Sequence, residues 1–312
     1  GPRDGVRGHG PGALPLRGAG MTTGVLAHVV VSGLATGSIY ALMALALVII
    51  YNATRTLNFA QGEMLMVSAF VAWASYTRLG LPLVVALAVA VAASALLAFV
   101  VERVIIRRSI AATHWDVLII TLGLSLVLRA GAGLVWSHDD FVFPSFFGND
   151  PIVLGRVRLA PVSLGIIAAS LAIMLGLYLL FTFTRLGRAM RAVAQNQNAA
   201  RLMGISVERV YSASWVLAAV VGALAGVLIA PVVFVSTKMG LVVINGFTAA
   251  VLGGFGSMPG AILGGMLLGV IENLAPLYLP TGIRYAVPFL LLIGILVVRP
   301  SGLLGRVERR KV

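Results

Sequence analysis

The sequence predicts an all-α membrane protein that crosses the bilayer several times. Of its 312 residues, 60% are hydrophobic and 11% are charged, whereas soluble domains average about 45–50% apolar and about 25% charged residues. The apolar residues gather in uninterrupted runs near the length of about 20 residues that a spanning helix needs. Because these runs do not alternate with polar residues, they exclude a transmembrane β-barrel.

The charge agrees with this class. The net charge of +13 comes from 23 Lys and Arg against 10 Asp and Glu. In a soluble protein this excess would suggest nucleic acid as a partner. Here most arginines stand beside apolar runs, which is typical of cytoplasmic loops that face anionic lipid. We therefore expect a lipid bilayer as the partner and no nucleic acid. The chain has no cysteine, so thiolate chemistry is excluded.

Residues 1–20 differ from the rest of the chain. They are rich in Gly, Pro and Arg and lack an apolar run long enough for a signal peptide. Met21, the first methionine, stands just before the first apolar run. We expect Met21 to be the native start, residues 1–20 to be a disordered, non-native extension, and residues 21–312 to form one transmembrane domain.

Hydropathy predicts about eight membrane segments. In chain order they are Val25–Ile50, Phe59–Thr77, Leu81–Val101, Val117–Trp136, Val162–Phe183, Val210–Phe234, Leu241–Asn273 and Tyr285–Val298.

The seventh segment has an unusual length. As one straight helix, Leu241–Asn273 would measure roughly 50 Å, too long for one crossing. Two full crossings would need about 40 residues. The sequence GGFGSMPG at Gly253–Gly260 breaks helices. We expect two short helices joined by a tight turn, with their ends buried in protein or lining a water-filled cavity.

The basic residues test this expectation. If Arg185–Arg209 is cytoplasmic and the seventh segment crosses twice, the N-terminus lies outside and the C-terminus lies in the cytoplasm. Most basic residues beyond position 20 then lie inside, including those of the tail Arg299–Lys311. With a single crossing the tail moves outside and the bias largely disappears. The positive-inside rule thus favours the broken pair.

A second break is predicted between the first two runs, at Tyr51–Glu63. Asn58, Gln61 and Glu63 lie beside or within the run that starts at Phe59. The segment is either an ordinary loop with helix-capping residues or an unwound turn at membrane depth. In the second case its ionisable residue is a functional candidate, because a charge there is costly.

The two breaks supply the residues that we expect along a translocation path. These candidates are Asn58, Gln61, Glu63, Asn245, Thr248 and Ser257. Arg129 is the other charge within a run. It has three possible arrangements, namely an ion pair with Glu63, an extended side chain that reaches the headgroups, and bonds to helix carbonyls.

The longest polar interval, Arg185–Arg209, carries five arginines and one glutamate. At helical spacing, one face gathers apolar residues and Asn196, from Ala189 to Met203, and the other carries arginines and amides. We expect a short amphipathic helix or a helix pair. It serves either to lie on lipid headgroups or to dock a soluble partner.

Several kinds of chemistry are missing from the sequence. There is no GxxxxGK[ST] loop for ATP and no HExxH motif for a metal. Glu63, Arg129 and Glu272 are nearly all the ionisable groups within the runs, too few for an intramembrane enzyme or a proton-coupled transporter. We expect no catalytic residue, metal or cofactor.

Four motifs in order resemble one family. They are GSIYALMALALVIIYNATRTLNFAQGEMLMVSAF at Gly37–Phe70, RAVAQNQNAARLMGI at Arg191–Ile205, GFTAAVLGGFGSMPGAILGGMLLG at Gly246–Gly269 and RPSGLLGR at Arg299–Arg306. Together they are similar to the LivH-type permease subunits of branched-chain amino acid ABC transporters.

The resemblance implies the fold of an ABC importer permease in a bacterial or archaeal plasma membrane. The chain would form half of the translocation path with a second related permease subunit. Two cytoplasmic ATP-binding subunits would drive transport, and an extracytoplasmic binding protein would deliver the substrate.

The resemblance also implies where the ATPase docks. Ala194–Gly204 is similar to the cytoplasmic coupling loop of ABC permeases, in which paired alanines precede a glycine. Ala199, Ala200 and Gly204 match that pattern. Asn198 stands where many relatives carry an acidic residue, so the polar contact with the ATPase differs here.

Two alternatives remain open. Permeases for urea or short amides share the same motifs, so the substrate is not decided. A stand-alone, ion-coupled transporter belongs to another class. It would carry out uptake from an ion gradient without ATP.

Overall fold

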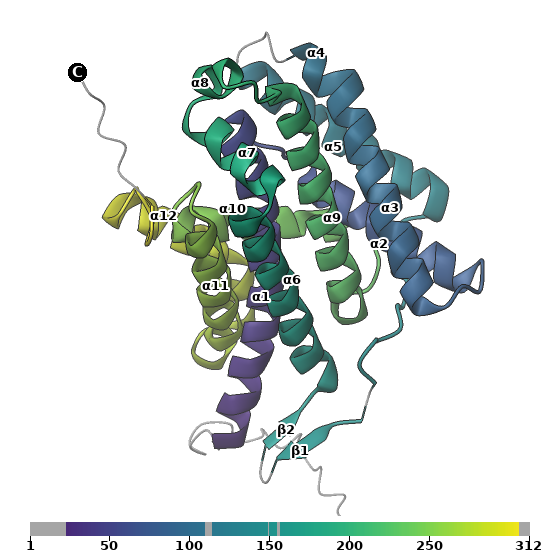
Figure 1. The fold of residues 1–312 in the computed structure, drawn as a ribbon. Helices are drawn as coiled ribbons and strands as arrows, with labels where there is room; N and C mark the ends of the chain where they lie inside the picture. The colour runs from purple at the N-terminus through teal and green to yellow at the C-terminus, as the bar shows by residue number, and fades with distance from the viewer. Residues whose placement is uncertain (1–22, 110–113, 149, 155–156, 306–312) are drawn as a thin grey trace, which may run out of the picture.

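The computed structural model describes residues 23–109, 114–148, 150–154 and 157–305 (Figure 1). The prediction for residues 1–20 lies outside these ranges. The predicted all-α membrane class is confirmed: within the described ranges, six helices are long and apolar enough to cross a membrane, and shorter apolar helices accompany them.

The helices follow the predicted runs closely. The helices of 17 or more residues are α1 (Thr23–Thr54), α2 (Gln61–Thr77), α3 (Leu83–Val101), α5 (His114–Trp136), α6 (Pro161–Phe183), α9 (Val207–Val233) and α11 (Met258–Tyr278). The shorter ones are η1 (Glu102–Ile106), α4 (Arg107–Ser109), α7 (Arg185–Gln195), α8 (Gln197–Leu202), η2 (Met239–Leu241), α10 (Val242–Gly253), η3 (Thr281–Ala286) and α12 (Val287–Val298).

Helix α1 forms the centre of the bundle. It packs against α6, α9, α10 and α11. Of its most apolar stretch of 18 residues, 89% is buried. In Figure 1, α11 and α12 lie on one side of α1, whereas α2, α3 and α9 lie on the other. The corresponding stretches of α3, α5 and α6 are only 22–28% buried, so these helices form the outer part of the chain.

Glycines allow α1 and α11 to touch through their backbones. Gly33 and Gly37 of α1 lie against Gly265 and Gly269 of α11. A Cβ atom added to Gly265 would stand 2.4 Å from the backbone nitrogen of Ala41. Small residues at a four-residue spacing are the usual means of such close approach in membranes.

The predicted broken pair is confirmed. Gly254 and Gly256 turn the chain between α10 and α11 with φ values of 107° and 94°, a region that only glycine enters at little cost. The Ser257 side chain then caps α11 by accepting a hydrogen bond from the Gly260 amide, 3.2 Å away. Only α10 is short, because α11 continues to Tyr278 and is long enough to span the bilayer.

The bundle has two distinct ends. Figure 1 shows α4, α7 and α8 at one end and the start of α1 with a β-hairpin at the other. The hairpin joins β1 (Ile152–Leu154) and β2 (Val157–Leu159) antiparallel, with Ile152 opposite Leu159. It falls within a loop for which the sequence predicted no strand.

The glycine turn also lies at the end of the bundle that carries α7 and α8. Asn52, near the end of α1, donates a hydrogen bond to the Gly256 carbonyl, 3.0 Å away. The amides of Leu303 and Leu304 donate to the carbonyls of Leu252 and Gly253. The glycine turn, the end of α1 and the start of the C-terminal tail therefore lie together.

Candidate functional site

The break after α1 contains a buried polar network. Asn58 is 1% exposed and Gln61 is fully buried. The Asn58 amide donates to the Gln61 side-chain oxygen at 3.2 Å, and its own oxygen accepts from the Ala60 amide. The Gln61 amide in turn donates to the Ala218 carbonyl of α9 at 2.9 Å. One of these bonds takes up the backbone amide of Ala60 just before α2, and the other two satisfy the buried side-chain amides themselves.

Glu63 and Arg129 form an ion pair. The guanidinium Nη2 of Arg129 lies 2.5 Å from Oε1 of Glu63, so of the three arrangements open for Arg129 the structure shows the pair. The Glu63 side chain is 3% exposed and that of Arg129 is 40% exposed. A carboxylate this deeply buried in a membrane helix requires such a partner.

Two helices begin next to this ion pair. Gly62 of α2 packs against the Gly240 carbonyl of η2, and a Cβ on Gly240 would stand 2.7 Å from Oε1 of Glu63. Helix α10 begins directly after η2 and ends at the glycine turn at one end of the bundle. Its 12 residues rise only about 18 Å, so η2 lies inside the bundle. Discontinuous helices with buried ends are typical of transporters, where they surround a path for polar solutes.

The remaining path candidates lie in the second break. Thr248 is fully buried, and its hydroxyl has no hydrogen-bond partner among the described residues. Asn245 is half-buried, and the half-buried Ser257 serves as the cap of α11. The structure brings Asn58, Gln61 and Glu63 together. It places Thr248 on α10 and Ser257 at the glycine turn.

Phe247, which sequence reasoning passed over, connects the two breaks. Its ring lies 6.3 Å from that of Phe59 and 5.8 Å from that of Phe255. Phe255 meets Tyr51 edge to face at 4.6 Å. Phe247 is the only aromatic residue of α10, but its contacts with Phe59 and Phe255 are visible only in the packing.

The arginine-rich interval forms the predicted helix pair. Thr184 caps α7 by accepting from the Gly187 amide at 3.0 Å. Asn196 interrupts the helix and caps α8 by accepting from the Ala199 amide, also at 3.0 Å. Helix α7 buries Met190 and Val193, so the pair lies on the protein with its apolar face inward.

The end of this pair projects outward. Ala194 is half-buried and Ala200 is buried, whereas Asn198, Ala199 and Gly204 are exposed. The most exposed large apolar residues there are Leu202, at 89%, and Met203, at 82%. The helical spacing grouped Met203 with Val193 and Ala200 on one face, but those two residues are buried and Met203 is not. Helix α8 ends at Leu202 and Gly204 turns with φ 79°, so Met203 leaves the helical spacing.

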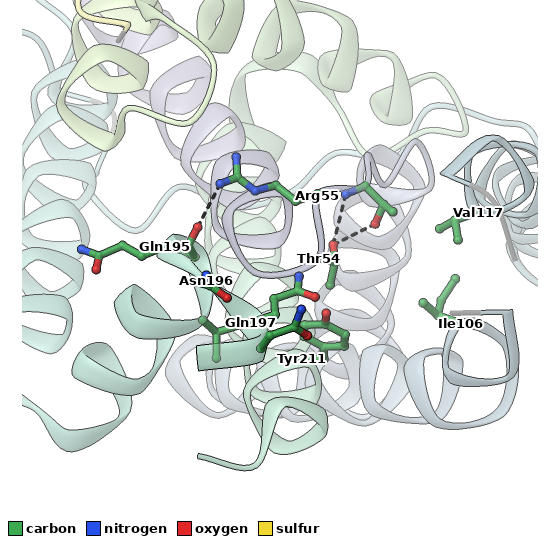
Figure 2. A pocket seen from close by; sticks show the side chains of 12 residues that line it. Thr54, Arg55, Ile106, Val117, Gln195, Asn196, Gln197 and Tyr211 are labelled. Atoms are coloured by element: carbon green, nitrogen blue, oxygen red, sulfur yellow. Dashed lines mark hydrogen bonds between the residues drawn. The ribbon is translucent and has the colours of Figure 1, made fainter. Parts of the chain in front are cut away.

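The helix pair is bonded to the end of α1. Arg55, with φ 58°, donates from Nη2 to the Ala194 carbonyl at 2.9 Å. Gln197 donates from its side chain to the Ala53 carbonyl at 3.2 Å. A pocket of about 470 Å³ lies beside these bonds, and Figure 2 shows Arg55 reaching from α1 to the junction of α7 and α8.

A second network attaches α9 to the neighbouring outer helix. Glu102 is fully buried and accepts two bonds from Arg107, each of 3.2 Å. Ser212 of α9 donates to the same carboxylate at 2.6 Å. The exposed segment is therefore bonded to α1 through Arg55 and Gln197, and the start of α9 that follows it is bonded to η1.

This arrangement is that of a polytopic membrane protein with an exposed amphipathic helix pair at one end. A family model described as "Branched-chain amino acid transport system / permease component" matches residues 29–296. The chain belongs to this family, and the predicted membership and ABC permease fold are confirmed.

Named relatives agree over nearly the full length. The chain is 34% identical to the "High-affinity branched-chain amino acid transport system permease protein LivH" of Escherichia coli K12, over 90% of this chain and 96% of the relative. It is 32% identical to the corresponding BraD of Pseudomonas aeruginosa over the same shares. A "Probable branched-chain amino acid transport permease protein LivH" of Methanocaldococcus jannaschii is 28% identical over 85% of this chain and 88% of the relative.

Proposed function

We propose that this chain is a permease subunit of an ATP-driven importer of branched-chain amino acids and forms half of the translocation path. In this proposal two cytoplasmic ATP-binding subunits drive the cycle, a second permease subunit completes the path and an external binding protein delivers the substrate. The end of the bundle that carries α7 and α8 then faces the cytoplasm, in agreement with the arginines gathered there.

One observation carries the proposal, namely the exposed apolar tip of the α7–α8 segment. Leu202 and Met203 are each more than four-fifths exposed. Large apolar side chains beside arginines form a docking surface for a soluble protein. The Ala194 carbonyl and the Gln197 side chain connect this tip to the end of α1. A push on the tip would thus reach the central helix directly.

The buried breaks support the transport role. The amides of Asn58 and Gln61 and the Glu63–Arg129 pair lie where α2 and η2 begin inside the bundle. A small movement of α1 or α9 would change these contacts, because Gln61 bonds to α9 and follows α1 by a short segment. We assign to this region the polar part of the path, with apolar walls around it for the substrate side chain.

The test is a double substitution at the tip, Leu202→Ser with Met203→Ser, in the complete transporter. Since both side chains are exposed, the variant should reach the membrane in the normal amount. Uptake of radiolabelled leucine should fall by about tenfold or more, in the range expected when interface anchors are lost. The matched control is Leu79→Ser, because Leu79 is 70% exposed and follows α2 at the opposite end of the bundle.

Unchanged uptake by the double variant would overturn the coupling role. Uptake by the purified chain in liposomes, driven by an ion gradient without ATP, would establish the stand-alone transporter instead. Binding measurements on the external binding protein would then identify the amino acid, because that protein selects the substrate in the proposed system.

A further inference from the structure

Helix α5 is held to the rest of the described chain chiefly through α2. Two contacts define this seam: the Glu63–Arg129 ion pair and the stacked rings of Phe70 and Trp136, 5.3 Å apart. On both helices the second contact lies seven residues after the first. The opposite face of α5 is open, with Leu126 and Leu134 exposed by 66% and 88%.

Arg129 makes this open face unusual. Seven residues, or about 10 Å of helix, separate it from Trp136 at the end of α5, so it lies within the apolar part of the span. Its side chain is nevertheless 40% exposed. The pair with Glu63 prevents the guanidinium from extending to the headgroups, and lipid tails offer no acceptor for its remaining N–H donors.

The other outer helices have no such feature. Helices α3 and α6 contain no charged residue, and lipid alone can cover them. On α5, Gly123 and Gly131 have open space where a side chain would stand, which would let another helix approach closely. A soluble partner cannot reach this depth. The open glycines and the unpaired Arg129 donors therefore fit a membrane helix that carries hydrogen-bond acceptors.

We propose that the outer face of α5 around Arg129, formed by Gly123, Leu126, Val127 and Ala130, packs against the second permease subunit. That subunit supplies hydrogen-bond acceptors to the part of the Arg129 side chain that Glu63 leaves exposed. Arg129 and Glu63 then lie next to the boundary between the two subunits, beside the buried break that follows α1 in this chain. The inference rests on the proposed function, because that function requires a second permease subunit.

A photo-crosslinking residue tests the surface in membranes that hold the complete transporter. We expect Leu126→p-benzoylphenylalanine to capture the second permease subunit, either a related chain or a second copy of this one, as identified by its peptide masses. The control is Tyr178→p-benzoylphenylalanine on α6, where the native side chain is exposed by 62% against 66% for Leu126. Capture of lipid alone at position 126, or equal capture at both positions, would overturn the inference.

A pair of glycine variants gives an independent measurement. Gly123→Leu and Gly176→Leu both place a side chain in open space on an outer helix, and both raise helix propensity, so each chain should fold. Recovery of the second subunit with the purified chain should fall by about tenfold for Gly123→Leu and stay unchanged for Gly176→Leu. Equal recovery with the two variants would contradict the proposed surface.

The two proposals fail in different ways. A native chain that imports amino acids with its ATPases, while residue 126 captures only lipid, overturns the α5 interface alone. A native chain that imports without any second permease subunit overturns the proposed function.

Discussion

Helices α1 and α6 are similar in composition and opposite in position. Both are long and apolar, yet 89% of the apolar window of α1 is buried against 28% for α6. The two helices differ in how their glycines meet the neighbouring backbone. Gly37 of α1 touches the backbone of α11, whereas Gly176 of α6 has no atom within 4 Å of its missing side chain. Burial inside a membrane bundle therefore follows matched small surfaces rather than hydropathy.

Arg129→Leu should have the largest effect on stability, because it removes the ion pair that holds the outer helix α5 to α2. The substitution leaves Glu63 as an unpaired carboxylate in an apolar interior, which typically costs about 3–5 kcal/mol. We expect a clear fall in the thermal unfolding midpoint of the purified protein. Arg103→Leu, at an exposed arginine of η1, should leave the midpoint unchanged.

The double variant Glu63→Gln with Arg129→Leu should recover most of this loss, because no charge is then left buried. If the single and double variants unfold at the same temperature, the unpaired Glu63 carboxylate is not the cause of the loss.

Gly265→Leu should have the next largest effect, because Gly265 lies at the close contact between α1 and α11. A Cβ at position 265 would stand within 2.4–2.7 Å of Ala41 atoms, so α1 and α11 must separate. Overpacking of this kind costs about 1–3 kcal/mol. The fraction of monodisperse protein after detergent extraction measures the effect, with Gly176→Leu as the outer control. Equal yields for the two variants would remove the basis of the comparison.

Ser94→Ala should have the smallest effect, and it tests how the outer helix α3 is held to α9. Ser94 is buried and donates to the Ala219 carbonyl at 3.1 Å. Loss of this bond should cost about 1 kcal/mol, seen as a small fall in the unfolding midpoint. Ser125→Ala removes only a bond to the Leu122 carbonyl within α5 and should cost less. A larger loss from Ser125→Ala would contradict this ranking.

Much of the architecture was predictable because it depends on local composition. The spans follow the apolar runs, the glycine turn at Gly254 and Gly256 breaks the seventh segment, and the helix pair after Thr184 follows its amphipathic spacing. The ion pair of Glu63 and Arg129 was one of three arrangements that the sequence left open, and the structure shows which one forms.

Other features depended on contacts between distant residues. The approach of Gly62 to Gly240 places η2 beside Glu63, and neither glycine stands out in the sequence. Met203 left its predicted face because the end of α8 was not visible in the spacing. Gln61 stands out in the sequence as a polar residue beside an apolar run, but only the structure shows that it bonds to α9.

The sequence by itself determined that this chain is a helical membrane protein, where its helices break and which segment is basic and amphipathic. These properties follow from the transfer of side chains to lipid and from backbone conformation, both of which act over a few residues. Only the tertiary structure decided that α1 lies at the centre and α5 at the edge, and that Arg129 is held by Glu63 with one side exposed. Lipid and protein interiors are about equally apolar, so helix positions depend on shape and on polar partners, which sequence patterns do not specify.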